Sequence, residues 1–223
     1  MIHIDRLDRA QALRYMAYSS GELSVTAQKY LDECESRLLD VIKPRSVYRV
    51  FDITSLSPTV LAGSISLPGN DISSHLDGCR KAAMLTVTVG DEADRLIRTM
   101  QIEDMAKAVM TDAFASAAVE QAADITEDMI AKENEGCFLT WRFSPGYGDL
   151  PLSAQKLFLQ CTDARRRIGV ACLESDLLTP VKSVTAIVGI SDSPIEKKRR
   201  GCVVCQLADE CLFRKRGTHC GYK

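Results

Sequence analysis

The chain has 223 residues and a mass of 24.6 kDa, enough for one sizeable core or for one domain with a small appendage. Hydrophobic residues make up 46% and charged residues 26%, which is typical of a globular protein. No apolar run approaches the roughly 18 residues of a membrane span, and the N-terminal sequence lacks the basic and apolar parts of a signal peptide. We therefore expect a cytoplasmic protein with no membrane partner.

The net charge of −2 conceals a division along the chain. Residues 194–223 hold eight Lys or Arg against three Asp or Glu, so this tail carries about +5 and the remainder about −7. This division predicts two parts: a domain of residues 1–193 and a basic, cysteine-rich tail of residues 194–223.

The first half of the chain predicts two helices and three strands. A long helix is expected to begin after Ser24, because apolar residues then recur every three or four positions. Asp71 is expected to cap a short helix after a Pro-Gly turn. Strands are predicted at residues 46–53, 59–62 and 82–90, the last being a continuous apolar run typical of a central strand covered on both faces.

The second half continues with helices and strands in alternation. The segment from Glu103 to about Glu133 has neither Gly nor Pro and is rich in Ala, so we expect one long helix or two in succession. Its small side chains would let another backbone or a flat ligand approach closely. Strands are predicted at residues 137–143, 167–173 and 183–190, and a helix at 152–160. The fold class expected is α+β (mixed α/β), with a mixed, partly antiparallel sheet and long helices.

Five of the nine cysteines lie singly in apolar segments, and we expect buried free thiols there. They are Cys34, Cys79, Cys137, Cys161 and Cys172. The odd total and the size of the chain argue against a secreted disulfide framework.

The segment TWRFSPGYGDLPL contains the only Trp and suggests a binding site. Arg142 can hold a carboxylate with two parallel hydrogen bonds, and Pro145 stiffens the turn that follows. Gly146 and Gly148 permit positive φ and bare backbone contact, while Tyr147 offers a ring face and a hydroxyl. These residues suit a small zwitterion that carries a flat base. They are also compatible with an ordinary strand-to-helix turn, in which the Arg makes a structural salt bridge and the Tyr covers the core.

Two motifs in this part of the chain resemble a known family. Arg142, Gly146 and Tyr147 match an Arg-x-x-x-Gly-Tyr motif. A following Glu-Ser…Pro…Ser-Val pattern is matched by Glu174, Ser175, Pro180, Ser183 and Val184. Both resemble the S-adenosylmethionine-binding activation domain of cobalamin-dependent methionine synthase. The likeness runs from about residue 141 to 189 and more loosely back to 100, and the first hundred residues resemble free-standing relatives of that domain.

The resemblance implies a role in reductive reactivation. The chain would bind S-adenosylmethionine and dock on the corrinoid domain of a partner methyltransferase, with methionine synthase the expected partner. The cobalamin carried by that partner would receive a methyl group and an electron, for which a redox protein is a possible donor. The chain would contribute positioning, and no acid–base constellation is required. It would therefore be an accessory component of a methyltransferase and would not turn over alone.

The resemblance also implies which residues bind the ligand. They are Glu120, Arg142, Ser144, Pro145, Gly146 and Tyr147. Arg142 would hold the methionyl carboxylate, the backbone of residues 144–146 would line the ligand, and Tyr147 would pack along it. Glu120 resembles the acidic ligand residue of the family, although a solvated Glu on a helix face fits the sequence equally well. Where the family has an aromatic, histidine-containing run, this chain has residues 187–191 (Ile-Val-Gly-Ile-Ser), so one ligand contact is lost or comes from elsewhere.

The tail contains four cysteines in the pattern Cys-x2-Cys-x5-Cys-x8-Cys: Cys202, Cys205, Cys211 and Cys220. Four thiolates so close together predict a bound metal. A zinc knuckle usually pairs two Cys-x2-Cys turns, whereas irregular, widening gaps are more typical of a 4Fe-4S cluster, so we favour the cluster over Zn. Interleaved basic residues would stabilise an anionic cluster. A solvated tail or a nucleic-acid patch has a similar composition, although nucleic acid is not the partner we expect.

Two functions are therefore compatible with the sequence. The first is reactivation of a corrinoid methyltransferase, with the cluster as an electron route. The second is a non-catalytic, zinc-binding adaptor of a corrinoid or folate one-carbon enzyme.

Overall fold

The computed structural model describes residues 2–18 and 23–195, together with 210 and 215. The helices are α1 (Arg9–Tyr15), α2 (Val25–Val41), α3 (Asn70–His75), α4 (Asp91–Glu103), α5 (Met105–Glu133), α6 (Gln155–Thr162) and α7 (Ala164–Ile168), with a 3-10 turn at Leu152–Ala154. The strands are β1 (Arg45–Leu56), β2 (Thr59–Leu61), β3 (Ile65–Leu67), β4 (Lys81–Thr88), β5 (Phe138–Leu139), β6 (Ala171–Cys172), β7 (Leu178–Thr179) and β8 (Ser183–Ser191). Across these described residues, no helix combines the length and the apolar content that crossing a membrane requires.

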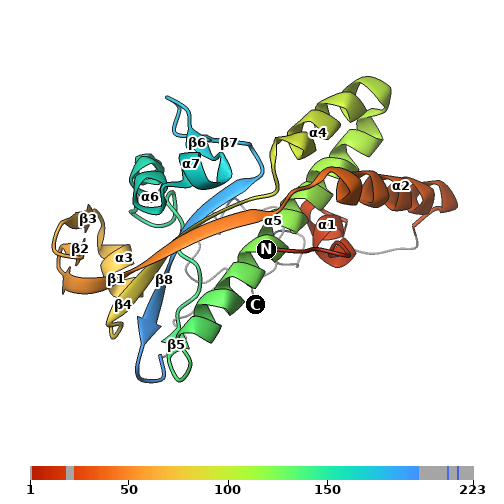
Figure 1. Cartoon of the computed structure of the whole chain (residues 1–223). Coiled ribbons are helices and arrows are strands. Elements are labelled where there is room, and N and C mark those ends of the chain that lie inside the picture. The colour runs from red at the N-terminus through yellow and green to blue at the C-terminus, as the bar shows by residue number, and fades with distance from the viewer. Residues whose placement is uncertain (1, 19–22, 196–209, 211–214, 216–223) are drawn as a thin grey trace.

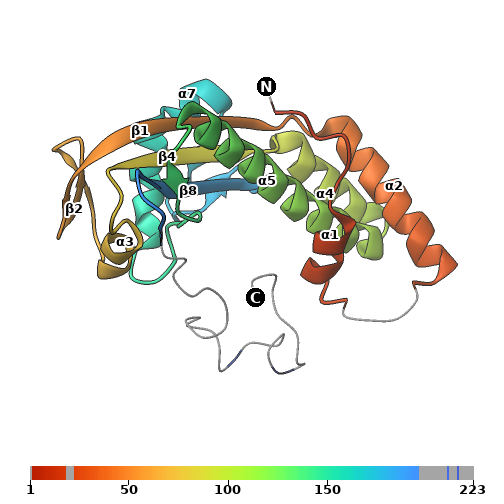
Figure 2. The same ribbon diagram turned by 90° about the horizontal axis from the view of Figure 1, so that it is seen from below.

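Six strands form one sheet in the order β3-β2-β1-β4-β8-β5, and β6 pairs with β7 in a small second sheet. Every described strand pair is antiparallel. Helix α5 crosses one face of the large sheet, and α6 and α7 lie on the other (Figures 1 and 2). Helices α1, α2 and α4 pack around the N-terminal half of α5. The predicted α+β class with long helices is confirmed, but the expectation of a mixed sheet is wrong, because every strand pair among the described residues is antiparallel.

Strand β4 is the centre of the fold, as its apolar sequence predicts. Ala83 and Leu85 pack in the cluster beneath α5, whereas Ala82 and Met84 pack in the cluster on the α6 side. All four side chains are fully buried. Because successive side chains of a strand point to opposite faces, a strand covered by helices on both sides must be apolar throughout.

The alanine-rich segment forms one helix of 29 residues, α5. The side chain of Asp104 caps it by accepting hydrogen bonds from the N–H groups of Ala106 and Lys107. Ala117, Ala118 and Ala122 are fully buried, so the small side chains bring the helix backbone close to its neighbours. The prediction of a closely packed alanine-rich helix is confirmed, and the residues before Asp104 form the separate helix α4.

The predicted strand at residues 167–173 is wrong. Helix α7 continues to Ile168, and Gly169 ends it with a φ of +75° in the left-handed region. Only Ala171 and Cys172 are extended, and they pair with β7 outside the main sheet. Helices α1 and α4 were not among the sequence predictions.

The five scattered cysteines carry free thiols, as expected. Cys34, Cys79 and Cys161 are buried. Cys137 and Cys172 are only partly buried, which corrects the expectation of burial for those two, because both lie in short segments at the ends of the fold.

Candidate functional site

The predicted strand at residues 137–143 runs beside β8 but is interrupted by a change of register. Leu139 pairs with Ile190, and four residues later Phe143 pairs with Ile187, three residues back along β8. One extra residue therefore lies on the side of the Trp segment, as in a β-bulge. The regular pairing of this segment with β8 is therefore limited to the two residues of β5 and to the single bridge at Phe143.

The extra residue decides where Arg142 points. Thr140 and Trp141 both lie on the α3 side of the sheet: Thr140 Oγ1 is 2.9 Å from Nε2 of the buried His75, and the Trp141 ring centroid is 4.6 Å from that of His75. Because two consecutive side chains lie on one face of the sheet, the side chains that follow lie on the opposite faces from those expected for a regular strand. Arg142 therefore points to the opposite side, towards α5.

Three carboxylates of α5 surround the guanidinium of Arg142. Nη2 lies 2.9 Å from Glu120 Oε2, and Nη1 lies 2.7 Å from Asp124 Oδ1 and 3.2 Å from Glu127 Oε2. Spacings of four and three residues place these carboxylates on one face of the helix. The structure thus brings together Arg142 and Glu120, which the sequence analysis assigns to one site. The contact is a salt bridge within the chain, as the alternative interpretation of an ordinary strand-to-helix turn expects. It adds Asp124 and Glu127, which their helical spacing from Glu120 could have revealed.

The Arg142 side chain is only 15% exposed. Burial works against its charge, but the carboxylates, Glu127 foremost, outweigh this and raise the pKa of the guanidinium above its usual value. A guanidinium has five N–H donors; Nη1 donates a hydrogen bond to Asp124 and Nη2 donates one to Glu120, while Glu127 adds an ion pair with Nη1. Among the described residues no acceptor is found for Nε–H or for the second N–H of Nη2. Arg142 is thus oriented from within the chain and keeps donors for a further anion.

The loop after Arg142 turns sharply beside this cluster. The Tyr147 N–H donates to the Ser144 carbonyl at 3.0 Å, which closes the turn around a buried Pro145. Gly146 and Gly148 have φ of +91° and +52°, which confirms the predicted need for glycine. The Tyr147 side chain remains 49% exposed.

Tyr147 is backed by a group of aromatic rings. Its centroid lies 6.0 Å from that of Phe143 in an edge-on arrangement and 6.5 Å from that of Trp141. Phe143 and Trp141 are in turn 5.0 and 4.6 Å from His75. The exposed ring of Tyr147 is therefore the outermost member of a packed aromatic cluster, at spacings typical of favourable ring pairs.

Two aspartates fasten the loop to α3. Asp149 accepts hydrogen bonds from the N–H groups of Asn70 (2.7 Å) and Asp71 (3.0 Å), and the Asp149 N–H donates to the Asp71 carboxylate at 3.1 Å. The cap residue of α3 is Gly69, so the prediction that Asp71 caps this helix is wrong. The carboxylate of Asp149 supplies the capping contacts from a distant part of the chain. The fit is close, because a Cβ on Gly148 would lie 2.1 Å from the Asp71 carboxylate.

Residues 187–191, which replace the aromatic run of the resembled family, belong to β8 and are buried. Their side chains fill both sides of the sheet, so they do not extend the surface around Tyr147. Cys202, Cys205, Cys211 and Cys220 lie outside the described residues. Within the described part, no group of three or more potential ligand residues could hold a metal ion.

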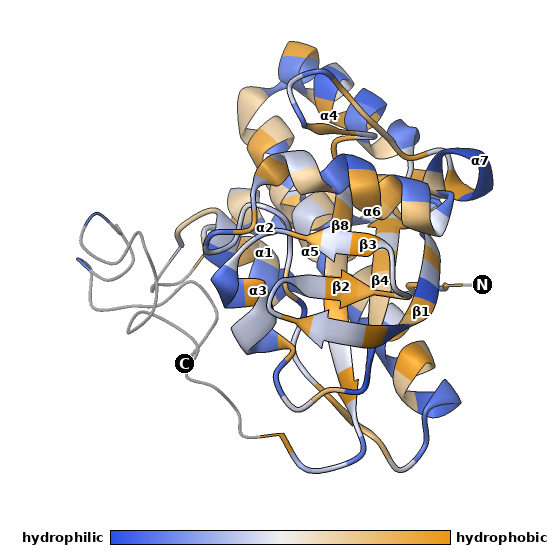
Figure 3. Ribbon diagram, turned by 90° about the vertical axis from the view of Figure 1, so that its left-hand side faces the viewer, coloured by the Kyte–Doolittle hydropathy of each residue, from blue (hydrophilic) through white to orange (hydrophobic). Residues whose placement is uncertain are grey.

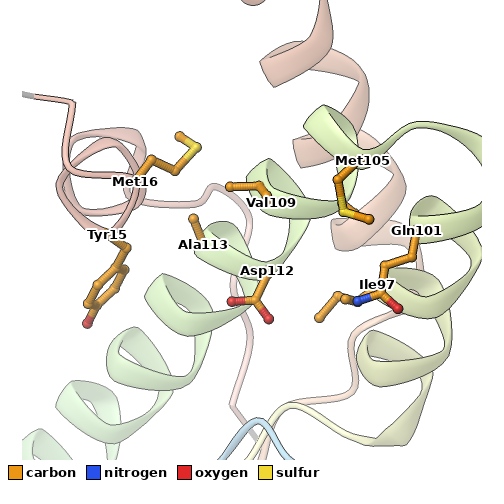
Figure 4. A pocket seen from close by; sticks show the side chains of 9 residues that line it. Tyr15, Met16, Ile97, Gln101, Met105, Val109, Asp112 and Ala113 are labelled. Carbon is orange, nitrogen blue, oxygen red and sulfur yellow. The ribbon is translucent and has the colours of Figure 1, made fainter.

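A cavity of about 230 Å³ opens elsewhere, between α1, α4 and α5. Tyr15, Ile97 and Met105 are among the residues that line it (Figure 4). It contains none of the predicted ligand residues. Its carboxylate, Asp112, is already 2.9 Å from Lys182 Nζ.

The antiparallel sheet, the long helix and the arginine beside a glycine-containing loop define a small α+β domain with a candidate site for a charged ligand. No family model and no curated protein matches the chain. Among solved structures, it is similar to the MetH reactivation domain bound to AdoHcy, with a TM-score of 0.58 and 16% sequence identity over 96% of this chain and 82% of that chain. The chain therefore has the fold of that reactivation domain.

Proposed function

We propose that this chain reactivates a corrinoid-dependent methyltransferase by binding S-adenosylmethionine beside Arg142 and presenting its methyl group to the cobalt of the partner. Two observations support this. The chain shares its fold with a methionine synthase domain that binds S-adenosylhomocysteine, the demethylated form of this ligand. The observation that carries most weight is the Arg142 cluster next to the Tyr147 loop, because it combines a cation and several anions at one edge of the fold.

The charges of the cluster match those of the ligand. Arg142 contributes one positive charge and the three carboxylates of α5 contribute three negative charges, so the cluster is anionic. S-adenosylmethionine carries a sulfonium and an ammonium against one carboxylate. Its carboxylate would accept hydrogen bonds from Nε and Nη2 of Arg142, and its cationic groups would face Glu120 and its neighbours. The anionic field favours the sulfonium over the uncharged thioether that remains after methyl transfer.

The remaining ligand residues would bind without charge. The exposed ring of Tyr147 would pack along the ligand, and the backbone from Ser144 through Pro145 to Gly146 would line it. The chain holds the sulfonium methyl in place, and the partner brings the cobalt. An electron from a redox protein would reduce the partner's cob(II)alamin to cob(I)alamin, which would accept the methyl cation as its bond to sulfur breaks, and S-adenosylhomocysteine would leave. Positioning of the two reactants can account for several kcal/mol of such a barrier, up to about 7–11 when the alignment is ideal.

For the tail, we propose a metal site formed by Cys202, Cys205, Cys211 and Cys220. The spacing supports a 4Fe-4S cluster that receives electrons from a redox protein, and Zn in an adaptor is the alternative. Anaerobic purification distinguishes them: a brown protein with broad absorbance near about 400 nm indicates the cluster, as thiolate-bound iron absorbs there, and a colourless protein with one equivalent of zinc indicates the adaptor.

The decisive experiment uses a methionine synthase that carries cob(II)alamin and lacks its own reactivation domain. With S-adenosylmethionine and a chemical reductant present, we expect methylcobalamin to form only when this chain is added. Its formation is measured by the visible absorption spectrum of the corrinoid. The Arg142→Ala variant should fail, and the Arg14→Ala variant, altered at an exposed arginine of α1, should act like wild type. Equal methylation with and without the chain would refute the proposal.

A further inference from the structure

Five exposed arginines gather on the face of the sheet opposite α5. Three of them, Arg165, Arg166 and Arg167, are consecutive in α7, which is anchored by its buried first and last residues, Ala164 and Ile168. Strand β1 contributes the other two, Arg45 and Arg49. We call these five residues the arginine face.

The fold holds the two strand arginines next to the helix. Arg45 and Arg49 stand on either side of Val47 on the same face of β1, because strand side chains alternate. Val47 packs with Ala164 and Ile168 of α7. Arg49 Nη1 also donates to the Cys161 carbonyl at 3.0 Å, close to where α7 begins. Figure 3 shows the hydrophilic ribbon of α7 on the same side of the molecule as the hydrophilic stretches of β1.

The described residues neutralise this face at one point: Asp163 lies 2.5 Å from Arg166 Nη2. For Arg45, Arg165 and Arg167 no ion pair exists within the described part of the chain. Like charges this close repel one another, so the face costs stability in the isolated chain. The cost is more notable because residues 1–193 are otherwise acidic.

The small hairpin beside the arginine face adds apolar surface. Cys172 and Leu178 of β6 and β7 pack on the same cluster as α7. At the hairpin, Leu173 and Leu177 are 49% and 57% exposed. Lys156 also lies at the hairpin, but it is paired with Asp176 at 2.6 Å. Arginines next to exposed leucines are typical of a protein interface, because arginine is enriched there and its planar fork binds a carboxylate with two bonds.

We propose that the arginine face, together with Leu173 and Leu177, is a docking surface for an acidic face of a partner protein. A long polyanion such as nucleic acid fits less well, because it would extend from this small area over the acidic remainder of the domain. The surface lies over α7 and β1 and shares no residue with the proposed ligand site, so this inference does not rest on the proposed function.

The test uses the full chain and two probes of equal charge: a 20-residue peptide of alternating Glu and Leu, and a single-stranded oligonucleotide. In NMR spectra that observe arginine Nε–H groups, the peptide should shift the signals of Arg45, Arg49, Arg165 and Arg167 and leave that of Arg142 in place. By fluorescence anisotropy, the double substitution Arg165→Gln and Arg167→Gln should weaken peptide binding about tenfold or more, since charged interface contacts are typically of that size. The matched control, Arg6→Gln with Arg14→Gln, removes the same charge from exposed positions elsewhere and should change affinity less than about twofold.

Three results would overturn the proposal. They are the absence of arginine shifts in the wild-type chain, an oligonucleotide affinity equal to or above that of the peptide, and an equal loss of affinity in the control variant. The NMR experiment needs no substitution, so the test stands even if the double variant folds poorly.

Discussion

Arginine occurs in two opposite settings on the two sides of the central sheet. On the α5 side, Arg142 lies among three carboxylates of its own chain and is largely buried. On the α6–α7 side, five arginines are exposed, and among the described residues the one ion pair they make is that of Arg166 with Asp163. Where the chain supplies an excess of anions, arginine becomes an oriented part of an anionic site that suits a cationic ligand. Where it does not, the surface retains a positive charge that an outside anion can satisfy.

Removing Arg142 should have the largest combined effect on ligand binding and stability, because it eliminates the buried arginine of the α5 side. In Arg142→Ala the carboxylates of Glu120 and Glu127 lose their counter-charge, and we expect affinity for S-adenosylmethionine to fall about 30-fold or more. The free energy of unfolding should fall by about 1–3 kcal/mol, because partly buried charged groups are left without a hydrogen-bond partner. Calorimetry and urea unfolding measure the two effects. Arg142→Lys, which keeps the charge and loses the planar fork, should recover more stability than affinity; recovery of both would contradict a two-bond contact with the ligand.

Substituting Gly148 tests whether the Tyr147 loop beside Arg142 must be held against α3 by the hydrogen bonds between Asp71 and Asp149. In Gly148→Ala the new methyl group meets the Asp71 carboxylate, so the contact with Asp149 has to break. We expect the free energy of unfolding in urea to fall by about 2–4 kcal/mol, the sum of about 1 kcal/mol of backbone strain at this positive φ and about 1–3 kcal/mol of overpacking.

Gly169 provides the matched control, because its φ of +75° is also positive but nothing lies within 4 Å of an added Cβ. Gly169→Ala should lower the free energy of unfolding by about 1 kcal/mol, which is the backbone strain alone. Equal losses in the two variants would show that the contact between Asp71 and Asp149 is unimportant.

The anionic character of the Arg142 cluster should appear as ligand selectivity. In Asp124→Asn the cluster loses one negative charge at an exposed position, so screening by solvent limits the effect. We expect S-adenosylmethionine to bind about threefold to fivefold more weakly, since about 0.5–1 kcal/mol is typical of such a charge. The affinity for S-adenosylhomocysteine, which keeps the ammonium but lacks the sulfonium, should fall by less. Calorimetry with both ligands makes the comparison, and equal changes for the two would contradict the charge argument.

The smallest effect should be a dependence of stability on acid pH. Hydrogen bonds from the backbone N–H groups of Asn70 and then Asp71 lower the pKa of Asp149 below its usual value of 3.8. A lowered pKa in the folded state means that this contribution is present above the usual value and is lost as the pH falls through the folded value. The melting temperature of wild type should therefore decline more steeply below pH 3.8 than that of Asp149→Asn. Parallel curves for the two proteins would show that the carboxylate does not hold the loop.

Much of the fold could be predicted from local sequence patterns. The spacing of apolar residues predicts α2, the continuous apolar run predicts β4, and the alanine content predicts α5. The strand predicted at residues 167–173 failed because its sequence is apolar and β-branched in part, while the packing of Ala164 and Ile168 against Val47 keeps the first residues helical. Local preference is weak enough for such packing to override it.

The turn residues of the candidate site were predicted from the sequence, whereas the partners of Arg142 on α5 were not. The turn residues Pro145, Gly146 and Gly148 are recognisable because they adopt restricted or positive φ for local reasons. A structural salt bridge of Arg142 was one of the two interpretations that the sequence allowed, but its partners Asp124 and Glu127 on α5 were not predicted, because they depend on the extra residue in the pairing with β8. Regular alternation would have turned that side chain towards α3.

By itself, the sequence determined the long helices α2 and α5, the buried strand β4 and the turns that need glycine, because these depend on the periods of helix and strand and on local φ and ψ. Only the tertiary structure decided that three carboxylates of α5 meet Arg142, that Asp149 caps α3 and that α7 and β1 place their arginines together. These are contacts between residues far apart in the chain. They arise from the register of neighbouring strands and the packing of helices on a sheet, and no local pattern specifies them.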